Sequence, residues 1–282
     1  MAPKVSVLMP VYNTQKKYLC DAIESVLSQT FEDFEFLILD DCPEQNVEDI
    51  VALYKDKRIK YIKNEQNIGI SASRNKLIDM ARGEYLAIMD HDDVSLAKRF
   101  EKQVKFLDKN PDVGVVGCWY ERFPKKKVIK KPLKNKDIVE TLLFSCCILH
   151  PSSMIRKEVL IKNNVRYEEK FSPSEDYALW CRLIGKTEFA NIPEVLFKYR
   201  DHKSNTTHEQ SKKMSDATVE IYNFVRKEHA YLWNIVKEKS VNVTRYHLFG
   251  VLPILTVKKQ GRRTNWLLFN VLPILSSKEK LM

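Results

Sequence analysis

YLAIMDHDD (residues 85–93) is a run of apolar residues that ends in three aspartates within four positions. FEFLILDD (residues 34–41) has the same form and ends in two aspartates. Apolar runs of this length, bounded by polar clusters, are typical of buried parallel strands. In an open α/β sheet the ligand crevice lies beyond the carboxyl ends of the strands. The two stretches therefore predict an α/β sheet that presents one acidic pocket, suited to a divalent cation, to a nucleotide-like ligand.

Strand-like and helix-like segments alternate through the first 120 residues. Between the expected strands, apolar residues recur at the 3.6-residue spacing of a helix face. This alternation predicts a mostly parallel central sheet that is flanked by helices on both faces. The strands are expected at 5–9, 34–39, 59–62, 85–89 and 113–117, and the helices at 19–27, 47–54, 77–81 and 96–107.

The alternation breaks after Tyr120. Five lysines between positions 125 and 131 predict either a solvated hairpin or loop, or a contact with acidic lipid headgroups. Further along the chain, a helix is expected at 138–144 and a strand at 150–156. A second helix is expected to begin at Glu175 and to end at Gly185.

The composition of the 282 residues, with 44% hydrophobic and 30% charged residues, is that of a globular chain. No run of 18 apolar residues is present, so we expect no transmembrane helix. The N-terminus leads directly into a strand-like run, so we expect no signal segment. The six cysteines lack CxxC or zinc-ligand spacing, which favours a reduced, cytoplasmic protein.

The C-terminal segment is strongly basic and carries a repeat. Nine of its residues from Lys237 to Met282 are Lys or Arg and two are Glu, within a net charge of +10 for the chain. LFGVLPIL (248–255) recurs as LFNVLPIL (268–275), and neither copy is long enough to span a bilayer. With flanking basic residues and Trp266, these runs suit a segment that lies in the membrane interface. The alternative is two small helices that pack on the main domain or on a partner chain.

Acidic residues at the strand ends are the candidate metal site. Carboxylates at i and i+2, such as Asp90 and Asp92, can bracket one Mg²⁺ or Mn²⁺ that also takes diphosphate oxygens. Asp40 and Asp41 follow a neighbouring strand and can accept a hydrogen bond from a base. Tyr12, which follows the first strand, can stack on that base.

Five basic or acidic residues outside the strand ends are ambiguous on sequence alone. Arg74 lies near the start of a helix, where it is either a surface residue or a phosphate contact. Arg200 can clamp a diphosphate, and His202 can complete a metal shell or remain a polar loop residue. Glu175 and Asp176 lie in the first turn of a helix, where the macrodipole alone favours carboxylates.

In combination these motifs resemble those of family 2 glycosyltransferases with the GT-A fold. The resemblance covers residues 4–205 in order, and two departures stand out. Cys42 and Pro43 replace the usual Gly-Ser after the Asp pair, and the Gln-x-x-Arg-Trp motif of processive polymerases is missing after Trp180. The matching motifs are VSVLMPVYN (5–13), SVLSQT (25–30), DD (40–41), NxG (67–69), AxRN (72–75), DHDD (90–93), HPS (150–152), EDYxLWxR (175–182) and YRxH (199–202).

The resemblance implies an inverting, metal-dependent transfer of one hexose or N-acetylhexosamine from a UDP-sugar to a hydroxyl of a lipid-linked saccharide. The basic repeats look like the tails of bacterial enzymes that build lipopolysaccharide or other surface glycans. The implied divisions are a donor half (1–120), an acceptor and base half (121–210) and a helical, basic, membrane-associating extension (211–282). The implied site residues are Asp176 as the base with Glu175 as the alternative; Pro10, Tyr12, Asp40, Asp41, Arg74, Asp90 and Arg200 for the donor nucleotide; and Asp92, Asp93 and His202 for Mn²⁺ or Mg²⁺.

Three other functions remain as alternatives. A nucleotidyltransferase would need a Gly-rich, basic phosphate loop after the first strand, and residues 10–13 do not supply it. A nucleic-acid-binding protein would spread its charge along a groove, whereas here the excess is terminal and flanks apolar repeats, so no nucleic acid is expected. A catalytically silent, carbohydrate-binding relative is the third. The expected location is cytoplasmic, at the inner face of the plasma membrane.

Overall fold

The computed structural model describes residues 2–239, 242–248, 252–260, 263–268 and 272–278. The chain divides into two compact units, one that ends at Phe224 and one that begins at Val225. The first unit contains a nine-stranded sheet in the order β3-β2-β1-β4-β8-β6-β9-β5, with β7 paired to β6.

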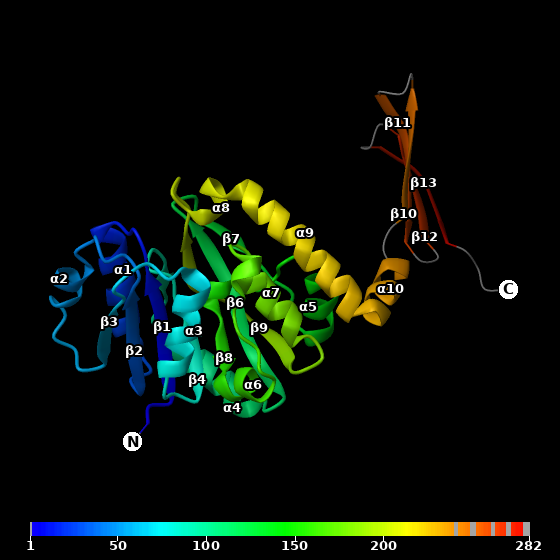
Figure 1. Ribbon diagram of the computed structural model, residues 1–282. Helices are drawn as coiled ribbons and strands as arrows, with labels where there is room; N and C mark the ends of the chain where they lie inside the picture. The colour runs from blue at the N-terminus through cyan, green and yellow to red at the C-terminus, as the bar shows by residue number, and fades with distance from the viewer. Residues whose placement is uncertain (1, 240–241, 249–251, 261–262, 269–271, 279–282) are drawn as a thin grey trace. The chain divides into compact units, whose positions relative to one another are not determined.

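One half of this sheet is parallel, as the alternation of elements predicts. β1 pairs in parallel with β2 on one side and with β4 on the other, and β3 continues the sheet beyond β2. Figure 1 shows β1, β2 and β3 side by side in blue at this end of the sheet. Every residue of β1, β2 and β4 is buried, which explains their mostly apolar sequence. Their bounds are β1 Val5–Val11, β2 Phe34–Asp40, β3 Ile59–Lys63 and β4 Tyr85–Ile88.

The other half of the sheet contains both parallel and antiparallel strand pairs. In this half the sheet differs from the mostly parallel sheet that we expect from the sequence. β8 runs antiparallel to both β4 and β6, because it begins beside the carboxyl end of β4. β9 is parallel to β6 over most of its length, while β5 and β7 form antiparallel pairs at the margins. The bounds are β5 Val94–Ser95, β6 Val113–Phe123, β7 Lys127–Ile129, β8 Met154–Arg156 and β9 Glu188–Arg200.

Helices flank the sheet and complete the core. α3 lies against β1 and β2, and α4 lies against β6 and β9. The ring of Phe100 on α4 meets Phe34 on β2 edge-on, with the centroids 5.7 Å apart. The bounds are α1 Lys16–Leu27, α2 Val47–Val51, α3 Ile70–Met80, α4 Arg99–Lys109, α5 Asn135–Leu142, α6 Lys157–Lys162, α7 Glu175–Leu183 and α8 Thr206–Glu209, with 3-10 turns η1 His150–Ser152 and η2 Glu169–Phe171.

The end of α7 agrees with the sequence prediction. The helix stops at Leu183, and Gly185 adopts a φ of +77°, which favours glycine because it has no Cβ. The expected boundary between a donor and an acceptor half, at residue 120, falls inside β6. The two halves therefore share one sheet, and their separate roles stay a prediction.

The C-terminal segment differs from the expected helical extension. α9 (Ser211–Glu228) and α10 (Ala230–Lys239) confirm the helical prediction at its start. From Asn242 the chain forms a four-stranded antiparallel sheet instead, in the order β10-β11-β12-β13. Each apolar run carries a proline, which breaks a helix interior, among Val, Ile and Leu residues that suit a strand. These strands are β10 Asn242–Leu248, β11 Leu252–Gln260, β12 Arg263–Leu268 and β13 Leu272–Lys278.

Residues 249–251 and 269–271 of the two repeats lie outside the described residues. In the described part of the chain, no helix has the length and apolar character needed to cross a membrane.

Candidate active site

The acidic strand ends meet at one edge of the sheet, as predicted. Val11 at the end of β1 pairs with Asp40 at the end of β2, and Asp41 N donates to Val11 O at 2.9 Å. The end of β4 lies on the other side of β1, since Met89 N donates to Leu8 O at 3.0 Å. The same edge is therefore lined by the residues that follow these strands, namely Tyr12, Asp41 and Asp90.

Arg74 on α3 joins this edge to the N-terminus of α7. Its guanidinium donates from Nη1 to Glu175 Oε1, and its Nη2 lies 3.5 Å from Asp90 Oδ1. The guanidinium also lies over the ring of Tyr167, 5.5 Å from the centroid. Burial lowers the pKa of Arg74, but the charges of Glu175 and Asp90 outweigh burial and raise it above its ordinary value. Arg74 is thus a permanently charged link between the two sides of the site.

Asp176 and Glu175 are neighbours on α7, but their surroundings differ. Asp176 is half-buried, and its Oδ1 accepts a hydrogen bond from Tyr177 N at 2.7 Å. Burial and the charge of Glu175 raise the pKa of Asp176 to about 6, although Arg74 opposes the shift. Glu175 is buried and bonded to Arg74, and its Oε2 has no hydrogen-bond partner. A carboxylate that titrates near neutral pH and is open to a ligand is suited to accept a proton.

Asp90 and Asp92 are the more accessible acids of the DHDD motif, with side chains 29% and 17% exposed. Burial and the charge of Asp92 raise the pKa of Asp90, against the opposing charge of Arg74. Asp92 Oδ2 lies 2.8 Å from His202 Nε2, which confirms that the loop after β9 reaches the motif. His202 is therefore held next to Asp92, whose charge also acts on Asp90.

Asp93, by contrast, is fully buried beneath the loop. Its Oδ1 accepts from Arg200 N at 2.7 Å, and its Oδ2 has no hydrogen-bond partner. Burial, together with the charges of Asp92 and Asp90, raises the pKa of Asp93 well above its ordinary value. The geometry gives Asp93 a contact with the β9 loop, and its role as a metal ligand stays a prediction.

Arg200 is held by the protein rather than open to the crevice. Its Nε donates to Asp92 O at 2.6 Å and its Nη2 to Asp21 Oδ2 at 2.8 Å. The guanidinium also lies between the rings of Tyr18 and Phe123, 4.3 Å and 4.6 Å from their centroids. These contacts fix the DHDD loop, and a direct role on the diphosphate stays a prediction.

The acids after β2 are fully bonded to the protein. Asp40 accepts from Tyr61 Oη at 2.7 Å and from Cys42 N at 3.0 Å. Asp41 Oδ1 accepts from Asn64 Nδ2 at 2.7 Å and Ile68 N at 2.9 Å, while Oδ2 accepts from Gly69 N at 3.0 Å. These bonds shape the loops around the expected base site.

Tyr12 and Pro10 occupy different settings at the end of β1. Tyr12 is 54% exposed, so its ring is open to a stacking partner, whereas Pro10 is buried within the strand. The assignment of these two residues and of the bonded acids to the donor base stays a prediction.

Sequence reasoning missed Arg99, which is fully buried under the DHDD strand. Its Nη2 donates to Ile88 O at 2.8 Å and to Ser153 O at 2.9 Å, and its Nε donates to Gln103 Oε1 at 3.0 Å. Burial lowers the pKa of Arg99 to about 10, so the guanidinium keeps its charge at neutral pH. The signal was present: positions 99 and 103 are spaced four apart beside the apolar face of α4.

A second missed contact joins the loops after β1, β2 and β4. Thr14 Oγ1 lies 2.8 Å from His91 Nδ1, and Thr14 N donates to Gln45 Oε1 at 3.0 Å. Gln45 Nε2 in turn donates to Thr14 O, so Thr14 and Gln45 are bonded in both directions.

Comparison with known proteins supports the family that the geometry suggests. The sequence model of glycosyl transferase family 2 matches residues 6–165. An uncharacterized glycosyltransferase of Methanocaldococcus jannaschii is 42% identical over 207 residues, which cover 70% of this chain and 71% of the relative. The chain belongs to glycosyltransferase family 2.

Other relatives of this glycosyltransferase have more specific names. The Escherichia coli protein WfgD, named as a UDP-Glc:alpha-D-GlcNAc-diphosphoundecaprenol beta-1,3-glucosyltransferase, is 25% identical over 244 residues, 86% of this chain and 94% of WfgD. S. aureus TarS 1-349, solved with UDP-GlcNAc, superposes with a TM-score of 0.65 at 22% identity over 77% of this chain. The mannosyltransferase PcManGT of Pyrobaculum calidifontis, solved with GDP-Man and Mn²⁺, gives a TM-score of 0.58 at 16% identity over 82% of this chain and 70% of that chain.

The two structural matches confirm the GT-A fold of this glycosyltransferase. The chain spans 65% of the TarS fragment solved with UDP-GlcNAc, which is less than two thirds of its length.

The acids of this glycosyltransferase fit a divalent cation. Among the described residues, no three His, Cys, Asp or Glu side chains stand ready as a complete ligand set. Asp90 and Asp92 nevertheless repel each other, and His202 Nε2 contacts Asp92, so a cation between them would relieve the repulsion with the oxygen and imidazole donors that Mn²⁺ and Mg²⁺ accept.

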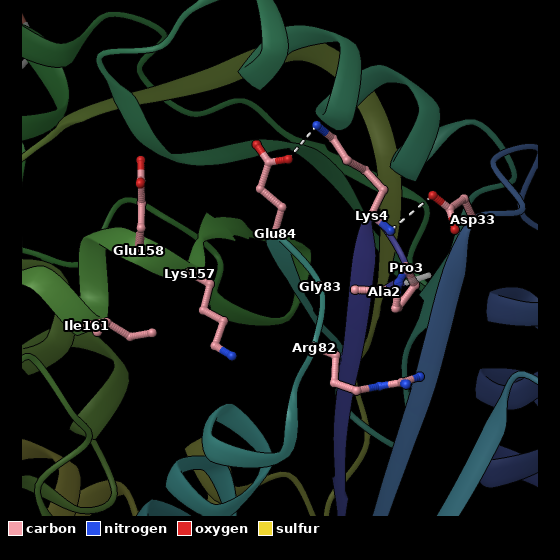
Figure 2. Close-up of a pocket in the computed structure, with 10 residues that line it drawn as sticks. All are labelled: Ala2, Pro3, Lys4, Asp33, Arg82, Gly83, Glu84, Lys157, Glu158 and Ile161. Atoms are coloured by element: carbon pink, nitrogen blue, oxygen red, sulfur yellow. Dashed lines mark hydrogen bonds and ion pairs between the residues drawn. The ribbon is translucent and has the colours of Figure 1, made fainter.

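A cavity of about 590 Å³ lies at the opposite, amino-terminal ends of β1 and β4 (Figure 2). The basic side chains that line the cavity already have partners: Lys4 contacts Glu84, Arg82 contacts Glu35, and Lys157 Nζ donates to Ala81 O. The cavity lacks the residues of the strand-end cluster and is therefore not part of the candidate active site of this glycosyltransferase.

Proposed function

We propose that this family 2 glycosyltransferase moves one hexose or N-acetylhexosamine from a UDP-sugar to a hydroxyl of a lipid-linked saccharide, with inversion and with Mn²⁺ or Mg²⁺. The process served is lipopolysaccharide or other surface-glycan synthesis. The observation that carries the proposal is the contact of Arg74 with both Glu175 and Asp90, which links the DHDD motif to the first turn of α7, where Asp176 has a pKa of about 6. The names of WfgD and of the TarS complex support a UDP-sugar donor, and that of WfgD supports a lipid-linked acceptor.

Asp176 acts as the general base. Its carboxylate takes the proton of the acceptor hydroxyl while the acceptor oxygen forms a bond to the anomeric carbon. The bond from that carbon to the diphosphate oxygen breaks on the opposite face, so the configuration inverts and UDP leaves. Glu175 is the less suitable base, because one of its oxygens is bonded to Arg74 and its side chain is buried.

The donor is held by the strand ends. Asp90 and Asp92 with His202 hold the cation, which when bound offsets the charge that develops on the UDP leaving group. Arg74 adds a fixed positive charge next to them, since it lies 3.5 Å from Asp90. Tyr12 and Pro10 with Asp40 or Asp41 form the site of the base, and Asp93 and Arg200 hold the DHDD loop from below.

The enzyme works at the inner face of the plasma membrane as a peripheral protein. The excess of Lys and Arg between residues 237 and 282 supports attraction to an anionic lipid surface. A lipid-linked acceptor, as in the name of WfgD, presents its hydroxyl at that surface.

The test is a nucleotide-sugar panel with purified protein, Mn²⁺ or Mg²⁺, and a polyprenyl-diphosphate-linked saccharide. We expect release of UDP with one UDP-sugar, formation of a product of inverted anomeric configuration by NMR, and loss of both on addition of EDTA. Release of pyrophosphate from nucleoside triphosphates would instead identify a nucleotidyltransferase. Absence of turnover with every sugar nucleotide, together with sugar binding, would identify a silent carbohydrate-binding relative.

A further inference from the structure

The segment 124–136 concentrates positive charge on the first unit. It contains seven lysines and no acidic residue. It forms the turn between β6 and β7, then β7 itself, and then the chain up to the start of α5. Pro124 to Val128 are all exposed. We call residues 124–136 the lysine segment.

The backbone of the lysine segment is fixed on the sheet. β7 pairs antiparallel with β6, with Tyr120 opposite Ile129. Trp119 Nε1 donates to Lys131 O at 3.1 Å, and Asn191 Nδ2 on β9 donates to Pro132 O at 2.6 Å. The lysines are therefore presented from a defined strip along β6 and β9 rather than from a free loop.

The charge of the lysine segment is largely unneutralised. Lys125 lies 3.4 Å from Asp201, but that carboxylate is shared with Arg122 and His208. Within the described residues, the other six lysines of the segment form no ion pair. Such a strip has the charge that complements a surface of many phosphates.

Apolar side chains accompany these lysines. Val128 is 45% exposed and Leu133 is 38% exposed, although neither belongs to the core. Apolar residues among lysines are typical of segments that lie in a membrane interface, where the lysine ammonium groups contact phosphates and the apolar groups enter the headgroup region.

The lysine segment also lies beside the candidate active site. Phe123, directly before it, pairs with Arg200 across β6 and β9, and Asp201 N donates to Phe123 O at 2.9 Å. The next residue, His202, contacts Asp92. A surface bound to the lysine segment is therefore adjacent to the loop that carries the metal-site residues.

We propose that the lysine segment docks the catalytic unit on an anionic lipid bilayer. This proposal rests on the proposed function in one respect. Docking would hold the candidate active site at the surface where a lipid-linked acceptor presents its hydroxyl. The proposal assigns the membrane contact to a strip of the main sheet. It does not depend on the basic C-terminal residues.

The test compares two variants of the full chain with equal net charge. One replaces Lys126, Lys127, Lys134 and Lys136 by Gln, which leaves Lys125 and its contact with Asp201 in place. The control replaces four exposed lysines on other elements by Gln. The control lysines are Lys105, Lys109, Lys162 and Lys186.

Co-sedimentation is measured with vesicles of phosphatidylcholine alone and with 30% phosphatidylglycerol. We expect wild-type protein to bind only the anionic vesicles, and binding to weaken as salt is raised. The segment variant should lose about 10²-fold in partitioning, while the control loses less than about threefold. Equal losses in both variants, or no loss in the segment variant, would overturn the proposal. A preference of the wild-type protein for RNA over anionic vesicles in a gel shift would also overturn it.

A second readout separates this proposal from the proposed function. Sugar transfer to a short, soluble acceptor without lipid should be equal in the wild-type protein and the segment variant, and both should melt at the same temperature. If no transfer occurs with wild-type protein but vesicle binding still requires the segment, the proposed function fails and the docking stands.

Discussion

Two acidic strand ends with the same sequence form have opposite environments. Asp41, after β2, accepts hydrogen bonds from Asn64, Ile68 and Gly69. Asp90 and Asp92, after β4, have fewer bonds within the described residues: Arg74 Nη2 lies 3.5 Å from Asp90, and His202 Nε2 lies 2.8 Å from Asp92. The first acid organises the loop that surrounds it, whereas the second pair lacks a full set of donors and is available to a ligand.

The difference arises from the loops on the carboxyl side of the two strands. In the loop between β3 and α3, a glycine with a φ of +83° at position 69 lets the chain turn two amide groups toward Asp41. After β4, three aspartates crowd one loop, and burial together with mutual repulsion raises the pKa of two of them. Hydrogen-bond donors, rather than acid content, distinguish a structural carboxylate from a candidate ligand.

The largest expected effect is at Asp176, which belongs with the acids that are open to a ligand. Asp176→Asn keeps the shape but removes the proton acceptor, so turnover should fall by about 10²–10⁴-fold. The measurement is kcat for UDP release with a saturating acceptor. Unchanged turnover would contradict the assignment, and Glu175→Gln would then be the next variant to test.

Asp92→Ala should act on the donor site without much effect on the fold. We expect turnover to fall by about 10²–10³-fold, the size typical for loss of one electrostatic stabiliser. Calorimetry should show that Mn²⁺ no longer strengthens UDP binding. Full metal-dependent binding in this variant would place the cation elsewhere. Its melting temperature should stay near that of the wild type, because the side chain contacts only His202 among the residues described here.

Asp41→Ala should give the opposite result. It leaves Asn64 Nδ2 and the amide of Ile68 without the acceptor they use, while Gly69 N keeps Asn67 Oδ1 at 3.1 Å. The free energy of unfolding should fall by about 3 kcal/mol. Denaturant unfolding measures this, with Asp92→Ala as the matched control. If the two variants are equally stable, the contrast between the two acidic ends is wrong.

The pH profile tests the raised pKa of Asp176. Since the carboxylate titrates at about 6, kcat/KM should fall about tenfold for each pH unit below that value. The folded protein binds this proton more tightly than the unfolded chain, so its contribution to stability declines as pH rises from about 4 to about 6. Asp176→Asn should make that decline smaller in a pH series of melting curves, while the raised pKa values of Asp90 and Asp93 keep their own contributions.

Tyr61→Phe should have the smallest effect. It removes the hydroxyl that donates to Asp40 at 2.7 Å, while Cys42 N still donates to the same carboxylate. We expect a loss of about 1 kcal/mol in unfolding free energy. A loss above about 3 kcal/mol would show that Asp40 depends on one donor rather than on the whole loop.

Periodicity predicted the elements that carry the site but not the direction of every strand. β1, β2 and β4 are mostly apolar because both faces are covered, and this signal is local in sequence. The antiparallel course of β8 depends on where the chain re-enters the sheet after η1, which no local pattern encodes. In the C-terminal segment, the prediction of a helical extension does not hold for the apolar runs with Pro253 and Pro273, which lie in strands β11 and β13. A proline removes the amide that a helix interior needs.

For the site, the sequence predicted which residues gather and not how each is bonded. Arg74, Asp90, Glu175 and Asp176 meet as expected, because motifs at strand and helix ends converge. Arg200, by contrast, contacts Asp21, which lies 179 positions away in the chain, and the rings of Tyr18 and Phe123. Such partners come together only in the folded chain, so no local pattern predicts them.

The buried guanidinium of Arg99 is a fixed positive charge beneath the DHDD loop. Within the described residues it has no carboxylate partner of its own, and its charge interacts with Asp93 and Asp90. The acidic loop is thus partly neutralised from beneath before any ligand arrives. The protein can therefore keep Asp90, Asp92 and Asp93 close together in one loop.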